Sequence, residues 1–207
     1  MIYRHFFWDF DGTLYDSYDC IHEAARLALA EKGIAPPPDE LMQTLKRSLE
    51  TAFRRYAPNC DTRELMSIYR RYAHAMGVTR IRLYPGAKEM LQAVCDQGGR
   101  NYLYTHRHAA SANECLKRDG IAELFSDAVT ADDGFPMKPA PDALLSLMHR
   151  NGLDQTTCVM MGDRDIDLNA GKNAGMAACL FDPEGFYPDY PADWRFRSYG
   201  RMKETLL

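Results

Sequence analysis

Short apolar runs of strand length alternate with segments of helical periodicity over most of this chain. The first run, Ile2–Phe10, is dense in apolar and aromatic residues, and Asp11-Gly12 closes it. A run this short predicts a buried strand rather than a helix. From residue 87 onward the alternation is regular, which predicts a parallel sheet with helices on both faces. The predicted strands of this part are Asn101–Thr105, Ala128–Thr130, Thr157–Met161 and Met176–Phe181, and the helices are Ala87–Gln97, Ala109–Asp119, Pro141–Asn151 and Asp165–Ala174.

A helical stretch interrupts this alternation. Ser17 is placed to cap a helix that runs to about Lys32, and Gly33 stops it. Two further helical patterns cover Asp39–Tyr56 and Thr62–Met76. The stretch therefore predicts an inserted helical domain.

The expected fold is α/β, with two parts. Residues 1–15 and 83–207 form a Rossmann-like parallel-sheet core with helices on both faces, and residues 16–82 form the α-helical insertion. The tail is expected to add a last strand over Trp194–Arg197 and a last helix over Gly200–Leu206.

Composition excludes several classes of protein. The formal net charge of the 207 residues is -4, which argues against a nucleic-acid partner. No run approaches the ~20 apolar residues that a membrane span requires. The 6 cysteines occur singly with no C-x-x-C pair, as is typical of reduced thiols in a cytoplasmic protein. Residues 16–82 hold 11 Lys+Arg against 9 Asp+Glu, a weak indication that the insertion faces an anion.

Side chains suited to phosphate chemistry follow four of the predicted strands. In open parallel sheets, ligands bind at the carboxyl ends of the strands, so these side chains are expected to share one site. They are Asp9 and Asp11 after the first strand, Thr105 and His106 after the second, Lys138 past the third, and the run Gly162–Asp167 after the fourth.

Carboxylates dominate this set. Asp9 and Asp11 stand at i and i+2 of an extended segment, so they project to the same side and repel each other unless a cation intervenes. Asp163 and Asp167 are four residues apart where a helix begins and can also share a side. Asp167 can instead serve only to stabilise the helix N-terminus. Asp9 and Asp163 together would make an all-oxygen site, which suits Mg²⁺.

The combination resembles the phosphatases of the haloacid dehalogenase superfamily that carry a helical cap after the first strand. Four segments carry the resemblance, and their order and spacing match along nearly the whole chain; the nearest type is phosphoglycolate-phosphatase-like. The segments are Asp9-Phe10-Asp11-Gly12-Thr13-Leu14, Thr105 at a strand end, Lys138-Pro139-Ala140-Pro141-Asp142, and Gly162-Asp163-Arg164-Asp165-Ile166-Asp167.

The resemblance implies a role for each matching residue. Asp9 would be the nucleophile that forms an aspartyl-phosphate, and Asp11 the acid that protonates the leaving oxygen and then the base for water. Asp9, the Asp11 main-chain carbonyl and Asp163 would hold Mg²⁺, and Asp167 would support the metal site. Thr105 and Lys138 would bind the transferring phosphoryl group.

The expected substrate is a small phosphorylated metabolite. The protein is expected to be a monomer or homodimer that binds neither nucleic acid nor membrane. The backbone N–H of His106 can add to the phosphoryl grip. Arg54 of the cap is a candidate for a second anionic group on the substrate, although a solvated helix face is the simpler interpretation.

One departure from the family pattern stays open. His106-Arg107 stands where these phosphatases more often have Asn, and Arg107 is either an added phosphate contact or a plain surface arginine. Arg164 and Asp165 are expected to form a local ion pair or to serve the helix start.

Rival functions are weighed on the same residues. Dehalogenation is disfavoured because those similar enzymes lack the second acid, present here as Asp11. A sugar phosphomutase of the same superfamily and a non-catalytic phosphate-binding protein remain alternatives.

Overall fold

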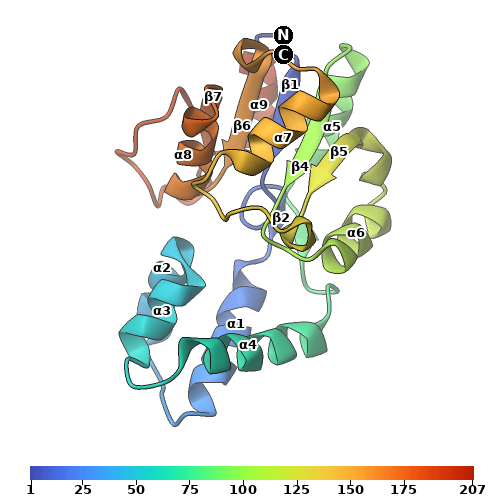
Figure 1. Cartoon of the computed structure of the whole chain (residues 1–207). Coiled ribbons are helices and arrows are strands. Elements are labelled where there is room, and N and C mark those ends of the chain that lie inside the picture. Colours follow the sequence, from blue (N-terminus) through green and yellow to red (C-terminus); the bar gives the residue numbers. More distant parts are fainter. The chain divides into compact units, whose positions relative to one another are not determined.

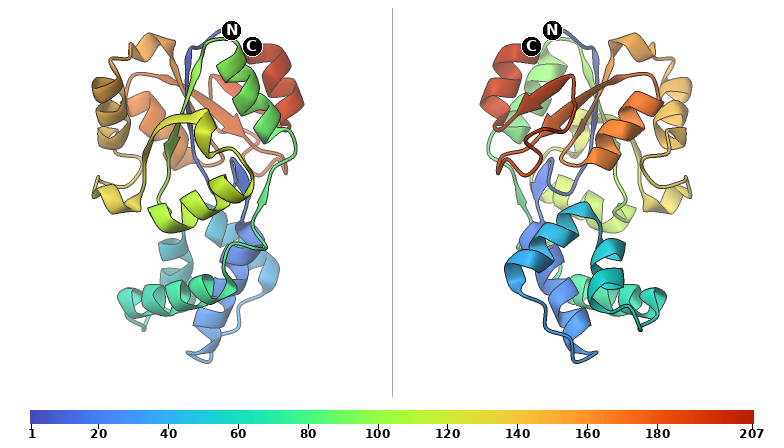
Figure 2. Two further views of the ribbon diagram at one scale, coloured as in Figure 1. Left: turned by 90° about the vertical axis from the view of Figure 1, so that its right-hand side faces the viewer. Right: turned by 90° about the vertical axis from the view of Figure 1, so that its left-hand side faces the viewer.

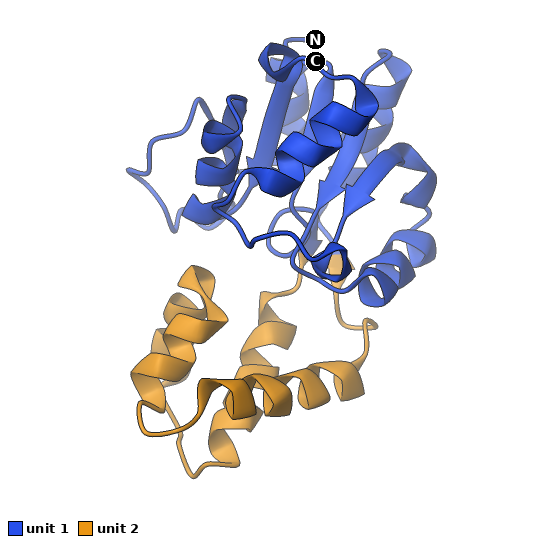
Figure 3. Ribbon diagram, in the orientation of Figure 1, with its two compact units in different colours: residues 1–15, 83–207 blue, residues 16–82 orange.

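Two units divide the chain in the computed structural model, which describes residues 1–207. The larger unit comprises Met1–Tyr15 and Leu83–Leu207, and the smaller comprises Asp16–Arg82 (Figure 3). The chain divides at the same residues as expected from the sequence, whereas the roles of the units as catalytic core and cap stay predictions. The two connections, β2 (Tyr15–Asp16) and β3 (Arg82–Leu83), pair as a short two-stranded sheet.

A six-stranded parallel sheet forms the centre of the larger unit (Figure 1). Its strand order is β5-β4-β1-β6-β7-β8, so β1 lies between β4 and β6. The expected α/β fold is confirmed. The strands are β1 (His5–Trp8), β4 (Arg100–Tyr104), β5 (Phe125–Val129), β6 (Cys158–Gly162), β7 (Ala177–Phe181) and β8 (Trp194–Phe196).

Helices cover both faces of this sheet (Figure 2). Helices α5 and α9 lie on one face, and α7 and α8 lie on the other. The central strands are buried on both sides, which explains their continuous apolar runs. The helices of this unit are α5 (Ala87–Asp96), α6 (Ala109–Arg118), α7 (Asp142–Asn151), α8 (Asp165–Asn173) and α9 (Tyr199–Leu206), with single 3-10 turns at Ala122–Leu124, Ala131–Asp133 and Gln155–Thr157.

The smaller unit consists of four helices with a core of their own. Apolar side chains from all four meet there, among them Ala25, Leu41, Phe53 and Leu65. The helices are α1 (Tyr18–Ala30), α2 (Pro38–Arg47), α3 (Leu49–Tyr56) and α4 (Thr62–Met76).

Three sequence expectations about elements need correction. The pattern over Asp39–Tyr56 is two helices, because Ser48 is extended and its side chain accepts the Thr51 N–H as the cap of α3. Ser17 is at the N-cap position of α1 but makes no capping hydrogen bond. Strand β5 begins at Phe125, not Ala128, because an edge strand tolerates polar residues that hide its start in the sequence.

Two further observations concern membrane spans and disulfides. No helix of the chain is long and apolar enough to cross a membrane. All 6 cysteines are free thiols.

Candidate active site

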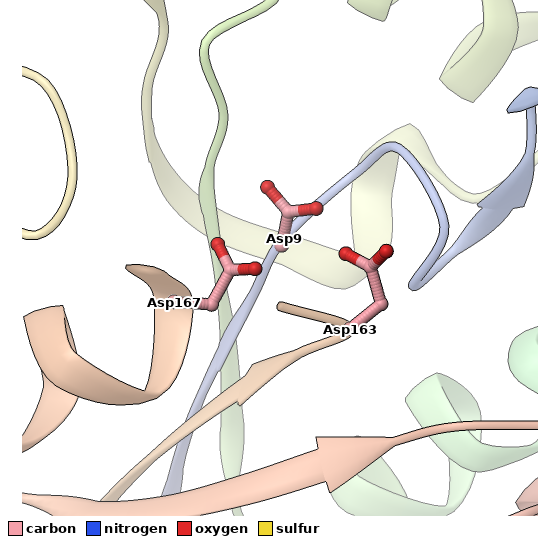
Figure 4. Close-up of side chains that lie close together, drawn as sticks. All are labelled: Asp9, Asp163 and Asp167. Atoms are coloured by element: carbon pink, nitrogen blue, oxygen red, sulfur yellow. The ribbon is translucent and has the colours of Figure 1, made fainter. Parts of the chain in front are cut away.

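Three carboxylates converge where β1 and β6 end (Figure 4). Asp9 follows β1, Asp163 follows β6, and Asp167 projects from the first turn of α8. One oxygen from each lies within 4.8 Å of one from each of the others. The chain runs outward from β1 to β4 and β5 and then crosses back to β6, so this is the switch point at which open parallel sheets bind ligands.

Lys138 lies between two of these acids. Its Nζ is 2.5 Å from Asp9 Oδ1 and 2.8 Å from Asp167 Oδ1, and it donates to the main-chain oxygen of Tyr104 at 2.9 Å. These three oxygens match the three N–H groups of an ammonium. The Tyr104 ring, 4.4 Å from Nζ, covers the charge from another side. A buried lysine is stable here because it is fully surrounded by acceptors.

The same contacts shift the ionisation of all three groups. Burial raises the pKa of Asp9 to about 6, because Lys138 offsets only part of the desolvation. Burial also acts to raise the pKa of Asp167, but Lys138 and Arg164 outweigh it and hold that pKa below its ordinary value. For Lys138, burial acts to lower the pKa, and Asp167 and Asp9 reverse this and raise it. The charge of Asp167 also acts to raise the pKa of Asp9, whereas the Arg164 N–H further lowers the pKa of Asp167.

The residues present fit a divalent metal. Asp9 Oδ2 is buried and has no hydrogen-bond partner, although a buried carboxylate oxygen normally has one. A metal ligated by Asp9 and Asp163 would satisfy that oxygen, and hard oxygen donors are those that Mg²⁺ prefers. Asp167 Oδ2 accepts the Arg164 N–H at 3.1 Å, whereas Oδ1 is ion-paired with Lys138 at 2.8 Å but, like Asp9 Oδ2, accepts no hydrogen bond. The support that Asp167 would give to the metal stays a prediction.

Thr105 and His106 lie at the end of β4 beside this cluster. The Thr105 hydroxyl accepts the Arg107 N–H at 3.0 Å, so its own hydrogen is available to donate to a ligand. The His106 Nε2 accepts the main-chain N–H of Lys138 at 3.0 Å, which holds the lysine loop and requires a neutral ring. Burial, assisted by Lys138 and Arg164, lowers the pKa of His106 to about 4.

Asp11 lies outside the three-carboxylate cluster and is held by Arg107. The guanidinium meets both carboxylate oxygens, at 2.5 Å through Nη2 and 3.3 Å through Nε. Only 17% of the Arg107 side chain is exposed, so the interpretation as a plain surface arginine is wrong. The main-chain role predicted for Asp11 at the metal stays a prediction.

The remaining sequence candidates lie as follows. Arg54 is on α3 of the smaller unit, largely exposed and ion-paired with Glu50 at 2.6 Å, so its substrate contact stays a prediction. Arg164 precedes α8, and its Nε is 3.8 Å from both Asp163 and Asp167. Arg164 thus pairs with Asp163 and Asp167, which the sequence did not predict, and Asp165 serves the helix start, where its Oδ1 accepts the Ile166 N–H at 2.9 Å.

The structure gives two further positions a part in the site that the sequence did not indicate, although Gly162 begins one of the motifs. Tyr104 contributes its main-chain oxygen and ring to Lys138, which its place in an apolar strand does not indicate. Gly162 allows Asp167 to cross close above the end of β6: a Cβ added there would meet Asp167 Cβ at 2.1 Å.

Comparison with known proteins decides the family. The model of the haloacid dehalogenase-like hydrolases matches residues 6–181, a range that contains Asp9, Lys138 and Asp163. The chain belongs to the haloacid dehalogenase-like hydrolases. The expectation of an enzyme from this superfamily is thereby confirmed.

Curated relatives of this hydrolase are phosphatases. A phosphoglycolate phosphatase from Vibrio vulnificus is 32% identical over 193 residues, covering 83% of this chain and 80% of the relative. A pyrophosphatase, PpaX, from Halalkalibacterium halodurans is 30% identical over 178 residues, covering 84% and 80%.

Solved structures agree with this placement. A hydrolase from Streptococcus pneumoniae TIGR4 is 32% identical, with a TM-score of 0.63 over 87% of this chain and 94% of that one. A haloacid dehalogenase-like family hydrolase from Streptococcus pneumoniae has a TM-score of 0.83 at 20% identity, covering 99% of each chain, and so supports the fold.

Proposed function

We propose that this hydrolase is a Mg²⁺-dependent phosphatase that cleaves small-molecule phosphate monoesters through an aspartyl-phosphate at Asp9. The single observation that carries the proposal is the meeting of Asp9, Asp163 and Asp167 with the Lys138 ammonium at one sheet edge. The phosphatase names of the relatives support the same chemistry.

The charges of the cluster explain how it accepts a phosphate. Asp9, Asp163 and Asp167 carry three negative charges when ionised, and Lys138 and Arg164 carry two positive ones. A divalent cation held by Asp9, Asp163 and the Asp11 carbonyl would make the balance positive and would neutralise charge on the transferring phosphoryl group. Without it, the cluster repels an anionic substrate.

The first chemical step transfers the phosphoryl group to the protein. An oxygen of Asp9 attacks phosphorus in line, the bond from phosphorus to the leaving oxygen breaks, and Asp11 gives that oxygen its proton. The Thr105 hydroxyl binds a phosphoryl oxygen, and Lys138 binds another by exchanging its contact with Asp9 Oδ1 for that oxygen. A positioned acid of this kind contributes roughly 10²–10⁴-fold to the rate.

The second step releases phosphate. Asp11, now ionised, takes a proton from water as the water oxygen attacks phosphorus, and the bond between phosphorus and Asp9 breaks. Inorganic phosphate leaves, and Asp9 and Asp11 return to their starting states. Dividing the hydrolysis into two displacements lowers each barrier.

Turnover of p-nitrophenyl phosphate tests the proposal. The wild-type protein should hydrolyse it with Mg²⁺, lose activity in EDTA and regain it when Mg²⁺ is restored. Asp9→Asn should lose activity by a factor of ~10³ or more while remaining folded, because the amide is not a nucleophile. The exposed loop residue Asp189 provides the control variant Asp189→Asn, which should match the wild type.

Trapping identifies the intermediate directly. Borohydride reduction of a quenched reaction should convert Asp9 to homoserine, which mass spectrometry of the N-terminal peptide detects. Full activity of Asp9→Asn, or full activity in metal-free buffer, would contradict the proposal.

A substrate panel then separates the alternatives. It should contain phosphoglycolate and pyrophosphate, which the names of the relatives suggest. Transfer of phosphate between positions of a sugar phosphate without release would identify a phosphomutase. Phosphate binding without any turnover would identify a non-catalytic binding protein.

A further inference from the structure

Arg107 grips the carboxylate of Asp11 as a planar fork. Its Nη2 is 2.5 Å from Asp11 Oδ1 and its Nε is 3.3 Å from Asp11 Oδ2, so each oxygen meets a different nitrogen. Two-point contact of this kind fixes the plane of a carboxylate, which a single hydrogen bond does not. The contact therefore sets the direction in which Asp11 presents its oxygens.

The arginine itself is anchored independently of Asp11. Its Nη1 donates to Ser111 Oγ at 2.9 Å, and its guanidinium carbon lies 4.9 Å from the centre of the Phe10 ring. Its main-chain N–H donates to Thr105 Oγ1, and its main-chain oxygen accepts the N–H of Ala131. A side chain fixed at both ends is a rigid reference point, so the fork orients Asp11 rather than following it.

The fork is compatible with proton transfer by Asp11. A carboxylate has about four lone-pair positions, and a fork uses one on each oxygen. Each oxygen keeps acceptor capacity in the plane that the fork defines. All of these groups belong to the larger unit.

We propose that Arg107 is the positioning residue for Asp11, holding the carboxylate in the orientation from which it exchanges a proton with the leaving oxygen. The inference rests on the proposed phosphatase function and assigns the residue that the sequence left open. Arg107 acts through Asp11 and not on the phosphoryl group.

The dependence on leaving group distinguishes this role from a structural one. Protonation by Asp11 matters greatly for a poor leaving group such as phenol and little for 2,4-dinitrophenol, which departs as an anion. The ratio kcat/KM reports only events up to the first irreversible step, here the transfer to Asp9. Misorienting Asp11 should therefore penalise phenyl phosphate selectively.

The experiment measures kcat/KM of Arg107→Gln on both esters with Mg²⁺. We expect a loss of roughly 10–100-fold on phenyl phosphate and of less than about threefold on 2,4-dinitrophenyl phosphate. Arg107→Lys, which keeps the charge without the fork, should resemble Arg107→Gln. Ser111→Ala removes one anchor and should show a smaller loss in the same direction. The control Arg201→Gln removes an exposed arginine paired with Glu204 and should change nothing.

A double-mutant cycle tests whether the effect passes through Asp11. In the Asp11→Asn background, Arg107→Gln should cause no further loss on phenyl phosphate, because residues acting as a unit are not additive. Thermal melting should show Arg107→Gln folded like the wild type.

Each contrary outcome has a distinct meaning. Equal losses on the two esters, full additivity in the cycle, or complete recovery in Arg107→Lys would overturn the positioning role while leaving the phosphatase proposal intact. A wild-type protein that hydrolyses neither ester would overturn the proposed function, and this inference with it.

Discussion

Lys138, Asp9 and Asp167 depend on one another at the scale of single residues. The ammonium is fully buried between the two carboxylates, and removing one partner from such an arrangement leaves an uncompensated charge. His106 also holds this arrangement, because its Nε2 accepts the main-chain N–H of Lys138 and so fixes the backbone that carries the lysine side chain. The ionisation of His106 is therefore connected to the geometry of the site.

This link predicts a pH dependence of stability. The pKa of His106 is lowered from 6.5 to about 4 in the folded protein, chiefly by burial, so between these values the unfolded chain binds a proton that the folded chain does not. Stability should therefore fall as the pH drops from about 6.5 to about 4, by at most about 3 kcal/mol from this group. His106→Asn should flatten that slope in urea unfolding curves measured across this range.

A control variant isolates the effect. His149 is exposed on α7, and His149→Asn should leave the slope as in the wild type. The Lys138 N–H loses its ring acceptor in His106→Asn, so that variant should also be less stable at neutral pH by about 1–2 kcal/mol. If His106→Asn left the pH dependence of stability unchanged, the His106 ring would have the same pKa in the folded and unfolded chain.

At this scale, the sequence predicted which residues form the site where a motif names them. It did not predict which side chains contact one another. Strand-end position and spacing predicted that Asp9, Asp163 and Lys138 would come together. The pairing of Arg107 with Asp11 joins residues 96 positions apart through a fork whose angle depends on both backbones. Sequence left that arginine between two interpretations, and neither included Asp11.

The turn from β6 into α8 shows how elements hold the site. Helix α8 begins so close to the strand end that the Asp167 side chain passes over Gly162, with 2.1 Å between its Cβ and the position of a Cβ on the glycine. Real Cβ atoms do not approach that closely, so only glycine fits without displacing the helix start. The glycine thereby permits the contact between Asp167 and Lys138.

Gly162→Ala should therefore damage both stability and the site. We expect a loss of about 1–3 kcal/mol in the free energy of unfolding from the forced shift of α8, with phosphatase activity lowered because Asp167 leaves Lys138. Urea unfolding and p-nitrophenyl phosphate turnover measure the two effects.

Gly200→Ala provides the matched control, because no atom lies within 4 Å of the added Cβ and the residue is exposed on α9. Its stability should be unchanged or raised by up to about 1 kcal/mol. If Gly162→Ala behaved like this control, the close approach would not be needed.

The sequence predicted the elements with strong periodicity but not all of their boundaries. The central strands of the core were anticipated because burial on both faces gives them continuous apolar runs. The break at Ser48 was hidden, because α2 and α3 together keep a helical spacing of apolar residues, and it is the extended backbone of Ser48 and its cap contact with Thr51 that separate them. The polar edge strand β5 gave a similarly weak signal for its start.

At the scale of the whole molecule, the acidic cluster belongs to one of the two units. The carboxylates of Asp9, Asp163 and Asp167 all belong to the larger unit, and the smaller unit has a separate apolar core. Local openings of α1 to α4 therefore need not break the proposed metal site. Binding of an ion to the native larger unit should stabilise that unit by mass action and leave the smaller one unaffected.

Hydrogen exchange of the intact chain checks this prediction. With Mg²⁺ at 100 times its dissociation constant, stabilisation of about 2.7 kcal/mol should slow exchange by roughly 100-fold in the most protected amides of β1, β6 and α8. Amides of residues 16–82 should exchange as they do without Mg²⁺. Asp163→Asn should abolish the slowing, and added NaCl at the same ionic strength should not reproduce it. Equal slowing in both units would mean that the ion stabilises the chain as one cooperative body, and that the smaller unit senses the metal before any substrate is present.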